Sequence, residues 1–177
     1  MNWYVYDLGT GKTDFDHEHK VVLGTIRVGD LSIANIARTH NARVGDAITF
    51  LGWSSQPAPN SDSIAVVRGQ SLNLDLYWRA DRTIRESFTV FVHLIDASAR
   101  VVADADSPPC QGLFPTDRWA SGETVRDRHP LTIPKSLAPG NYSIEIGMYL
   151  PATGIRLPIE TPSMRTDKIV LSQVSVF

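Results

Sequence analysis

Three stretches of the sequence show the two-residue period of a β-strand. Between residues 72 and 78, leucines and a tryptophan alternate with asparagine, aspartate and tyrosine. Successive side chains of a strand point to opposite faces, so this alternation predicts a strand with one buried face. Residues 142–150 show the same period. In residues 88–95 apolar side chains fall on both parities, which predicts a central strand covered on both faces.

A fourth stretch, residues 168–177, changes the parity of its apolar positions between Leu171 and Val174. Such a change predicts a β-bulge, here near Ser172 and Gln173. Shorter runs that we also expect to form strands are residues 3–7, 21–28, 33–37, 47–53, 64–67, 101–105, 124–133 and 155–158. For residues 31–38, with Asp30 as a candidate N-cap, a short helix is the alternative.

Glycine-containing turns separate the apolar runs. They include Gly45, Gly69, Gly122, Gly140 and Gly154. Many short strands divided by turns, with no apolar period of a long helix, predict an all-β fold. We therefore expect an immunoglobulin-like or jelly-roll-like antiparallel β-sandwich of about 8 to 11 strands.

A change of composition near residue 40 predicts a domain boundary. Residues 9–20 are polar and rich in aspartate and histidine, whereas strands and turns follow closely from about residue 43. We expect residues 1–42 to form N-terminal strands and a polar loop that pack on the sandwich. Residues 43–177 are expected to form the sandwich itself.

The overall composition excludes several classes of protein. The chain has 177 residues, with 17 Lys and Arg against 19 Asp and Glu, and a formal net charge of −2. Nucleic-acid-binding proteins normally carry a basic excess, so we expect no nucleic-acid partner. The single cysteine, Cys110, excludes an internal disulfide and a cysteine-rich zinc site. No apolar run reaches the roughly 18 residues of a membrane helix, so we expect the chain as given to be soluble.

Two N-terminal motifs resemble ligand sites. Residues 9–13 resemble the end of a phosphate-binding P-loop, but that motif requires a glycine where Tyr6 stands, so we expect no nucleotide. Asp16, His17 and His19 are candidate metal ligands, because imidazoles and carboxylates together suit zinc. The alternative is a solvated polar loop. No cofactor is predicted.

The sequence offers no catalytic residues. It has neither a G-x-S-x-G elbow nor an H-E-x-x-H motif. His93 lies within a predicted strand, where a histidine is more typically a hydrogen-bonded structural group than a base. Asp104 and Asp106 are close enough to suggest a glycosidase pair, but nothing in the sequence separates their environments. We therefore expect a protein that is not an enzyme.

The long polar loop between residues 104 and 128 is the best candidate for a binding site. A tryptophan ring can stack on the apolar face of a sugar, while carboxylates and guanidinium groups bind its hydroxyls. The candidate ligand-binding residues are Trp119, Asp106, Asp127, Arg128, Arg118 and Tyr149. The alternative is that Trp119 plugs the open edge of the sandwich and Asp127 pairs with an arginine to hold the loop.

Tyr142 is a candidate for a different, structural function. It follows Pro139-Gly140 at the start of a predicted strand. In immunoglobulin-like folds a tyrosine in such a corner donates a hydrogen bond to upstream backbone. We expect the same of Tyr142.

Several motifs in fixed order carry a resemblance to a known family. They are Gly45-Asp46-x-Ile48-x-x-Leu51-Gly52-Trp53, Leu74-x-Leu76-Tyr77-Trp78, Thr89-Val90-Phe91-Val92-His93-Leu94-Ile95-Asp96, Asp106-Ser107-Pro108-Pro109, Pro115-Thr116-x-x-Trp119-x-x-Gly122-Glu123, Asp127-Arg128-His129, Pro139-Gly140-x-Tyr142, Gly147-x-Tyr149 and Arg156-Leu157-Pro158. Residues 43–177 thereby resemble the C-terminal β-sandwich domain of bacterial membrane glycosyltransferases of the dolichyl-phosphate-mannose-protein mannosyltransferase type.

This resemblance implies an extracytoplasmic accessory domain and not a transferase active site, because no acidic catalytic motif of those transferases is present. The initial methionine indicates either a fragment or a stand-alone relative. The first hypothesis for function is a non-catalytic module that binds carbohydrate. The second is a purely structural sandwich that contacts a membrane glycosyltransferase region or another exported protein.

Overall fold

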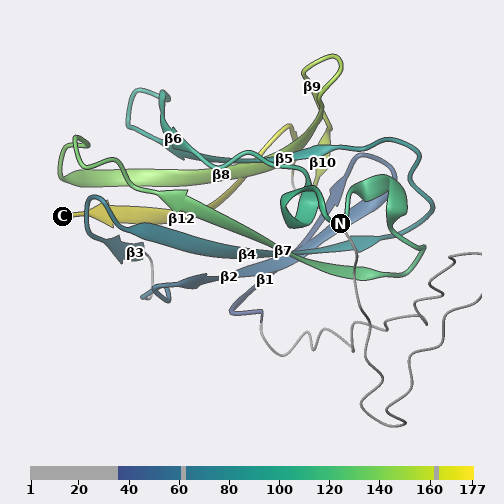
Figure 1. Ribbon diagram of the computed structural model, residues 1–177, viewed down its shortest axis with the longest axis horizontal. Helices are drawn as coiled ribbons and strands as arrows, with labels where there is room; N and C mark the ends of the chain where they lie inside the picture. The colour runs from purple at the N-terminus through teal and green to yellow at the C-terminus, as the bar shows by residue number, and fades with distance from the viewer. Residues whose placement is uncertain (1–35, 61–62, 162–163) are drawn as a thin grey trace, which may run out of the picture. The chain divides into compact units, whose positions relative to one another are not determined.

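The strands pair into two sheets that stack face to face as a β-sandwich (Figure 1). The computed structural model describes residues 36–60, 63–161 and 164–177. Along the central strands, every second side chain points between the sheets and is buried there, as alternating polarity requires. The predicted all-β sandwich is therefore confirmed.

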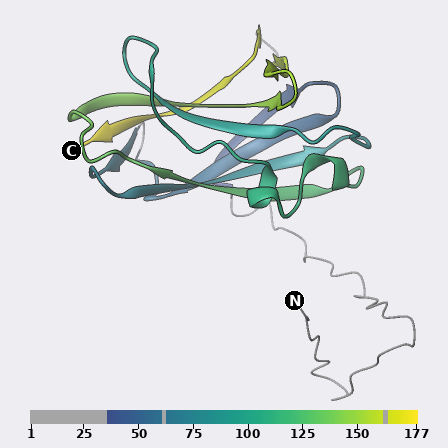
Figure 2. The same cartoon turned by 45° about the horizontal axis from the view of Figure 1, so that its top comes forward.

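The first sheet has the strand order β11-β10-β1-β2-β4-β7, and all neighbouring strands are antiparallel. Its strands are β1 (Arg38–Val44), β2 (Ile48–Gln56), β4 (Ser71–Ala80), β7 (Thr124–Thr132), β10 (Ile159–Glu160) and β11 (Arg165–Thr166). The chain reaches β7 from the second sheet through two short 3-10 turns, η2 (Pro109–Gly112) and η3 (Thr116–Arg118). Figure 2 shows these turns beside β7.

The second sheet has the order β3-β12-β8-β5-β6, and β9 pairs with β8 at one end. Its strands are β3 (Ser63–Val66), β5 (Thr89–Ile95), β6 (Val101–Asp104), β8 (Gly140–Leu150), β9 (Ile155–Arg156) and β12 (Ile169–Val176). The pair of β12 and β3 is parallel, so the predicted antiparallel sandwich contains one parallel pair of strands. No hairpin joins these two strands, so their direction is not fixed by a tight turn.

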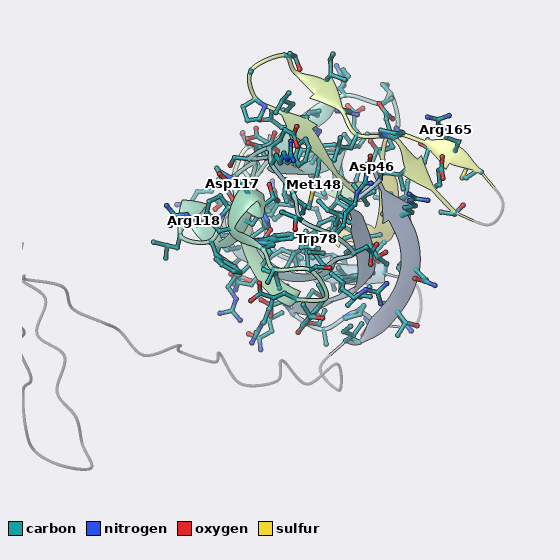
Figure 3. The ribbon with its side chains drawn as sticks, turned by 90° about the vertical axis from the view of Figure 1, so that its right-hand side faces the viewer. Asp46, Trp78, Asp117, Arg118, Met148 and Arg165 are labelled. Carbon is teal, nitrogen blue, oxygen red and sulfur yellow. The ribbon has the colours of Figure 1, made fainter. Side chains whose placement is uncertain are left out.

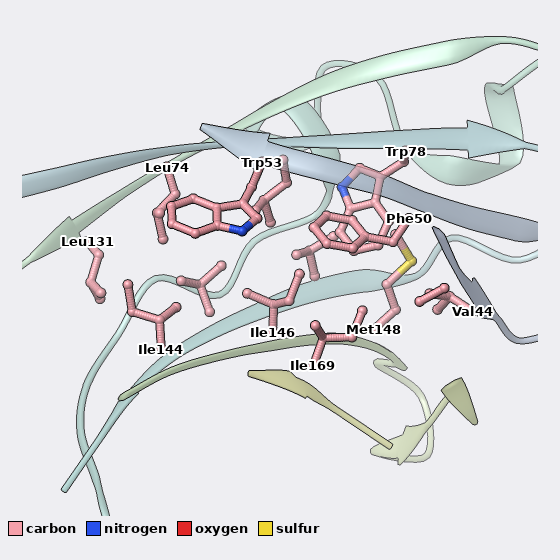
Figure 4. Packing of buried hydrophobic residues seen from close by; sticks show 14 of the residues in the cluster. Val44, Phe50, Trp53, Leu74, Trp78, Leu131, Ile144, Ile146, Met148 and Ile169 are labelled. Atoms are coloured by element: carbon pink, nitrogen blue, oxygen red, sulfur yellow. The ribbon is translucent and has the colours of Figure 1, made fainter. Parts of the chain in front are cut away.

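Aromatic and aliphatic side chains fill the space between the sheets (Figure 4). Phe50 and Trp78 of the first sheet lie with ring centroids 4.7 Å apart. They face Ile146 and Met148 of the second sheet. Burial of this apolar surface is the main stabilising contribution to such a fold.

The four clearest strand predictions are confirmed. They correspond to β4, β5, β8 and β12. β5 is central, between β8 and β6, and buried on both faces as expected. The register shift in β12 falls between Val170 and Ser172, so the bulge lies at Leu171, one residue earlier than predicted. The shorter runs at residues 47–53, 64–67, 101–105, 124–133 and 155–158 overlap β2, β3, β6, β7 and β9, respectively.

β1 was not predicted, because its sequence lacks the apolar alternation. Only Ala42 and Val44 of this strand are buried, and its other positions are mostly exposed and polar. β1 also begins at Arg38, before the expected start of the sandwich at residue 43. The expectations for residues 3–7, 9–20 and 21–28, and for most of 31–38, lie outside the described residues.

Within the part of the chain that the structure describes, no helix has the length and apolar character to cross a membrane.

Tyr142 occupies the predicted corner at the start of β8. Its side chain is largely buried, and its hydroxyl donates a hydrogen bond to the main-chain carbonyl of Ala138 at 2.7 Å. This bond closes the turn between β7 and β8, and the prediction from the sequence is confirmed.

Replacement of Tyr142 by phenylalanine should lower the free energy of unfolding by about 1 kcal/mol, because it leaves the carbonyl of Ala138 without this donor. Urea unfolding would measure the change. Tyr77→Phe is a matched control, since the buried hydroxyl of Tyr77 has no hydrogen-bond partner among the described residues. An equal loss in both variants would contradict a specific corner bond.

Candidate functional site

The ring of Trp119 lies in the core and not on the surface. Only 2% of this residue is exposed, and its Nε1 donates a hydrogen bond to the carbonyl of Phe114 at 3.0 Å. The main-chain amide of Trp119 donates to Thr116 in the preceding turn. In this conformation the ring closes the crossover between the sheets and presents no open face for a sugar.

Thr116 attaches the same crossover to the loop between β4 and β5. It is fully buried, and its Oγ1 donates to the carbonyl of Glu86 at 2.6 Å while accepting the amide of Phe88 at 2.9 Å. A hydroxyl that donates and accepts in this way satisfies two main-chain groups that would otherwise be buried without partners. Thr116 therefore fixes the position of the β4–β5 loop.

Asp127 and His129 form a buried pair on the inner face of β7. Both side chains are 0% exposed, and His129 Nε2 lies 2.7 Å from Asp127 Oδ2. The other ring nitrogen, Nδ1, lies 2.9 Å from the carbonyl of Ala105. The second carboxylate oxygen of Asp127 accepts the amide of Cys110 at 2.8 Å. The pair thus binds β7 to the segment that leaves β6.

Because both ring nitrogens of His129 face acceptors, both carry protons when Asp127 is ionised. Burial alone would lower the pKa of His129, but the hydrogen bond and negative charge of Asp127, with the carbonyl of Ala105 and the charge of Asp106, raise that pKa above its usual value. The raised pKa favours the protonated form of His129 in this sealed pair. A pair without access to solvent cannot serve as an acid or base for an external substrate.

Arg128 lies on the outer face of the first sheet and binds Asp75 of β4. Its Nε lies 2.9 Å from Asp75 Oδ1, and Arg126 Nη2 lies 2.6 Å from Asp75 Oδ2. Burial would raise the pKa of Asp75, but the hydrogen bonds and charges of Arg128 and Arg126 lower it overall. The guanidinium of Arg128 is thus already occupied by a carboxylate of the protein. Arg118 is exposed on η3 and projects away from the sandwich in Figure 3.

A different group of polar and aromatic side chains lies on the outer face of the second sheet. We call it the β5–β8 face and define it by Phe91, His93, Tyr149, Arg156 and Asp106. Its members on β5 and β8 are odd-numbered, whereas the side chains of these strands that face the core are even-numbered.

Phe91 is the apolar floor of the β5–β8 face. The ring lies against Gly147, where an added Cβ would stand only 2.5 Å from Phe91 Cε1. The guanidinium of Arg156 covers the ring with its carbon 4.2 Å from the centroid. This cation–π contact leaves Phe91 almost fully buried although it points away from the core.

A histidine–carboxylate contact and an ion pair flank Phe91. His93 Nε2 lies 3.2 Å from Asp106 Oδ1, which also accepts the amide of Val92 at 3.1 Å. On the β12 side, Lys168 Nζ lies 2.7 Å from Glu145 Oε1. A carboxylate therefore lies on each side of the aromatic floor, beside an imidazole on one side and an ammonium group on the other.

Tyr149 is an aromatic residue of this face that is partly exposed. It pairs with Thr89 of β5 and with Arg156 of β9. Within the described residues, its hydroxyl has no hydrogen-bond partner. An accessible ring with a free hydroxyl, beside a guanidinium, can both stack on and hydrogen-bond to a ligand.

A cavity of about 400 Å³ lies elsewhere, at the end of the sandwich where the β1–β2 turn meets the β4–β5 loop. We call it the end cavity. It is lined by Val44, Gly45, Asp46, Ala47, Ile48, Arg82, Thr83, Ile84, Arg85, Glu86, Phe88 and Leu157. Figure 3 views the molecule from this end, with Asp46 labelled.

The structure therefore distributes the six predicted site residues over several places. Asp106 and Tyr149 lie on the β5–β8 face, while Trp119 in the crossover and Asp127 on β7 are buried. Arg128 and Arg118 lie on other surfaces. Asp16, His17 and His19 are outside the described residues, and no group of three or more metal-ligating side chains occurs within 36–60, 63–161 and 164–177.

Thr116, His129 and Arg156 stand in the sequence motifs but were not among the predicted site residues. The parity of β7 contained the signal for His129, because Val125, Asp127, His129 and Leu131 all share the buried face. Arg156 belongs to a two-residue strand, which is too short for any periodic signal.

Asp127→Ala should lower the free energy of unfolding by about 3–5 kcal/mol, because it leaves His129 and the amide of Cys110 buried without their hydrogen-bond partner. Asp127→Asn is the matched control. Its amide oxygen can accept from Cys110, and its NH₂ can donate to a neutral His129. Urea unfolding should therefore show a much smaller loss in Asp127→Asn.

The raised pKa of His129 predicts that the stability of the fold depends on pH. Because the pKa of His129 is raised on folding, its stabilising contribution is complete below the usual imidazole pKa of about 6.5 and is lost as the pH rises through the folded pKa. Wild-type stability measured by urea unfolding should fall over that range, and Asp127→Asn should lack this fall. An identical slope in both proteins would contradict the ion pair.

No protein-family model matches the chain, and no curated protein matches it. Solved structures with a similar fold include the following two. One is the C-terminal domain of wzt, with a TM-score of 0.49 and 10% identity over 77% of this chain and 77% of that chain. The other is a Niemann-Pick type C2 protein from Japanese carpenter ant, with a TM-score of 0.46 and 6% identity over 80% of this chain and 97% of that chain.

Proposed function

We propose that this chain is a non-catalytic accessory module that binds carbohydrate on the β5–β8 face. The observation that carries the proposal is Tyr149, whose partly exposed ring and free hydroxyl lie next to Arg156. An aromatic ring with hydrogen-bonding groups around it is the chemistry that a sugar requires, because a pyranose has both apolar faces and hydroxyls.

The spacing of groups on this face favours an extended ligand over a single sugar. Tyr149 pairs with Thr89, and the His93–Asp106 pair lies four residues further along β5. At a rise of about 3.3 Å per residue, these two ends are roughly 13 Å apart. An oligosaccharide that contacts both would cross the Arg156 guanidinium between them.

A non-catalytic function is supported by the location of the acid–base groups. The His129–Asp127 pair is sealed, and Asp106 is engaged by His93 and the amide of Val92. Neither presents the pair of accessible carboxylates that glycoside hydrolysis needs. We propose further that the module is extracytoplasmic and is associated with a membrane glycosyltransferase, on the resemblance of its sequence motifs to that family.

The alternative function is a structural sandwich without a ligand that contacts another exported protein. The sealed crossover of Trp119, Thr116 and Asp127 favours it, because the loop with the most ligand-like composition serves to join the two sheets.

Backbone-amide NMR during titration with mannosyl, glucosyl and galactosyl oligosaccharides tests the proposal. We expect millimolar affinity, with shifts at Tyr149, Arg156 and His93. Tyr149→Ala should weaken binding at least tenfold, and Arg118→Gln on the distant η3 turn should not. NMR is preferable to tryptophan fluorescence, because Trp53, Trp78 and Trp119 are buried. No shift at millimolar sugar, or equal shifts in Tyr149→Ala, would overturn carbohydrate binding on this face and favour the structural alternative.

A further inference from the structure

The outer face of the first sheet is basic, although the chain as a whole has a formal net charge of −2. In the described strands of this sheet, the register places five arginines on the outer face but only two carboxylates, Asp75 and Glu160. On the outer face of the second sheet, by contrast, the strands carry one arginine, Arg156, with Asp104 and Glu145. We call the basic surface the arginine face and define it by Arg43, Arg79, Arg126, Arg128 and Arg165.

Part of the arginine face is a row of directly opposed residues that crosses all six strands of the sheet. From β11 to β7 this row runs through Arg165, Glu160, Arg43, Thr49, Arg79 and Thr124. At about 4.8 Å between neighbouring strands, the row is roughly 24 Å long. Guanidinium groups therefore recur across the whole breadth of the sheet.

The arginines of this face are more exposed than the carboxylates that they contact. The side chain of Asp75 is 10% exposed, against 37% and 57% for Arg126 and Arg128, which share it. Arg79 Nε lies 2.9 Å from Asp81 Oδ1, and Arg79 is again the more exposed partner. A surface that approaches this face therefore meets guanidinium groups before carboxylates.

Arg43 and Arg165 have weak contacts within the protein. Arg43 Nη2 donates to the main-chain carbonyl of Asp46 at 3.4 Å, and Arg165 Nε lies 3.8 Å from Glu160 Oε1. A guanidinium group has five N–H donors in a planar fork, and each of these contacts engages one nitrogen. The remaining donors have the geometry for bidentate hydrogen bonds to a phosphate group.

The arginine face lacks the apolar centre of a protein interface. Among the described residues, no exposed large hydrophobic side chain belongs to a strand of the first sheet. Protein–protein interfaces are enriched in aromatic and apolar side chains at their centre, whereas attraction to an anionic lipid surface requires only cations. A broad surface of arginines without apolar side chains therefore favours a lipid surface over a protein partner.

We propose that the arginine face docks on a membrane surface through the head groups of anionic phospholipids. The contact is electrostatic, because the face has no exposed apolar side chain to insert among the acyl chains. The β5–β8 face belongs to the other sheet, so docking turns that face away from the membrane. The proposal does not depend on carbohydrate binding at the β5–β8 face.

Co-sedimentation of the full chain with vesicles tests the proposal. At low salt the protein should bind vesicles of phosphatidylcholine and phosphatidylglycerol but not vesicles of phosphatidylcholine alone. Binding should be lost at about 1 M salt, where the screening length falls to about 3 Å. Absence of binding to the anionic vesicles, equal binding to both kinds of vesicle, or binding that salt does not weaken would overturn the proposal.

Arg43→Gln, Arg79→Gln and Arg165→Gln each remove one cation from the row and leave the buried contacts of Asp75 intact. Each should weaken binding to anionic vesicles about fivefold, and the triple variant roughly a hundredfold. If the triple variant fails to fold, the single variants decide the question. Unchanged binding in the folded variants would contradict docking through this row.

The matched control is a triple variant with the same net charge, Arg68→Gln, Arg100→Gln and Lys135→Gln. These residues lie in turns outside the strands of the first sheet. The control should bind anionic vesicles almost as well as the wild type. An equal loss in the two triple variants would show that net charge alone decides binding, and would rule out a defined docking face.

Two further measurements fix the orientation and the kind of partner. A spin label on the lipid head group should broaden the methyl signal of Thr124 on the arginine face more than that of Val170 on the opposite face, and the reverse order would overturn the proposed orientation. Binding to heparin without binding to vesicles would replace the membrane by a soluble polyanion. Tyr149→Ala should leave vesicle binding unchanged, so failure of the carbohydrate proposal is a separate outcome.

Discussion

The contact on which the arrangement of the two sheets depends is the buried pair of His129 and Asp127. Asp127 accepts a hydrogen bond from the amide of Cys110, and His129 bonds to the carbonyl of Ala105. The crossover is therefore attached to β7 at two points. Burying two charges is costly, and the cost is offset only when every polar atom finds a partner. The crossover must therefore follow one path, and that path sets where Thr116 and Trp119 enter the interior.

Much of the fold follows from side-chain parity, and the same parity could have located the buried pair. β4, β8 and β12 were predictable because their inner faces are almost wholly apolar. In β7 the inward positions include Asp127 and His129. Polar residues that usually lie at the surface therefore occupy positions that the strand period places in the interior. The composition of residues 104–128 predicted a ligand site, whereas the strand period at Asp127 and His129 would have indicated buried side chains.

The surfaces that remain as candidate sites could be predicted only in part. Tyr149 and Asp106 were identified from composition, but they share a face with Phe91 and Arg156 only because β5, β8 and β9 pair in a particular register. The end cavity joins residues that lie far apart in sequence, such as Val44, Phe88 and Leu157. Local sequence patterns cannot predict which distant residues become neighbours, because loop conformation and sheet order decide which chain segments lie together.

The parallel pair of β3 and β12 has a consequence for how the chain folds. Ser63 lies opposite Gln173, so this pairing closes a span of 110 residues. Ordering a chain over such a span costs entropy before the contact returns any energy, which makes the step slow. Until β12 arrives, β3 has neither its hydrogen-bonding partner nor a place in the second sheet. Conditions that delay this last pairing would therefore expose Ile64 and Val66, two fully or nearly buried residues, to association with other chains.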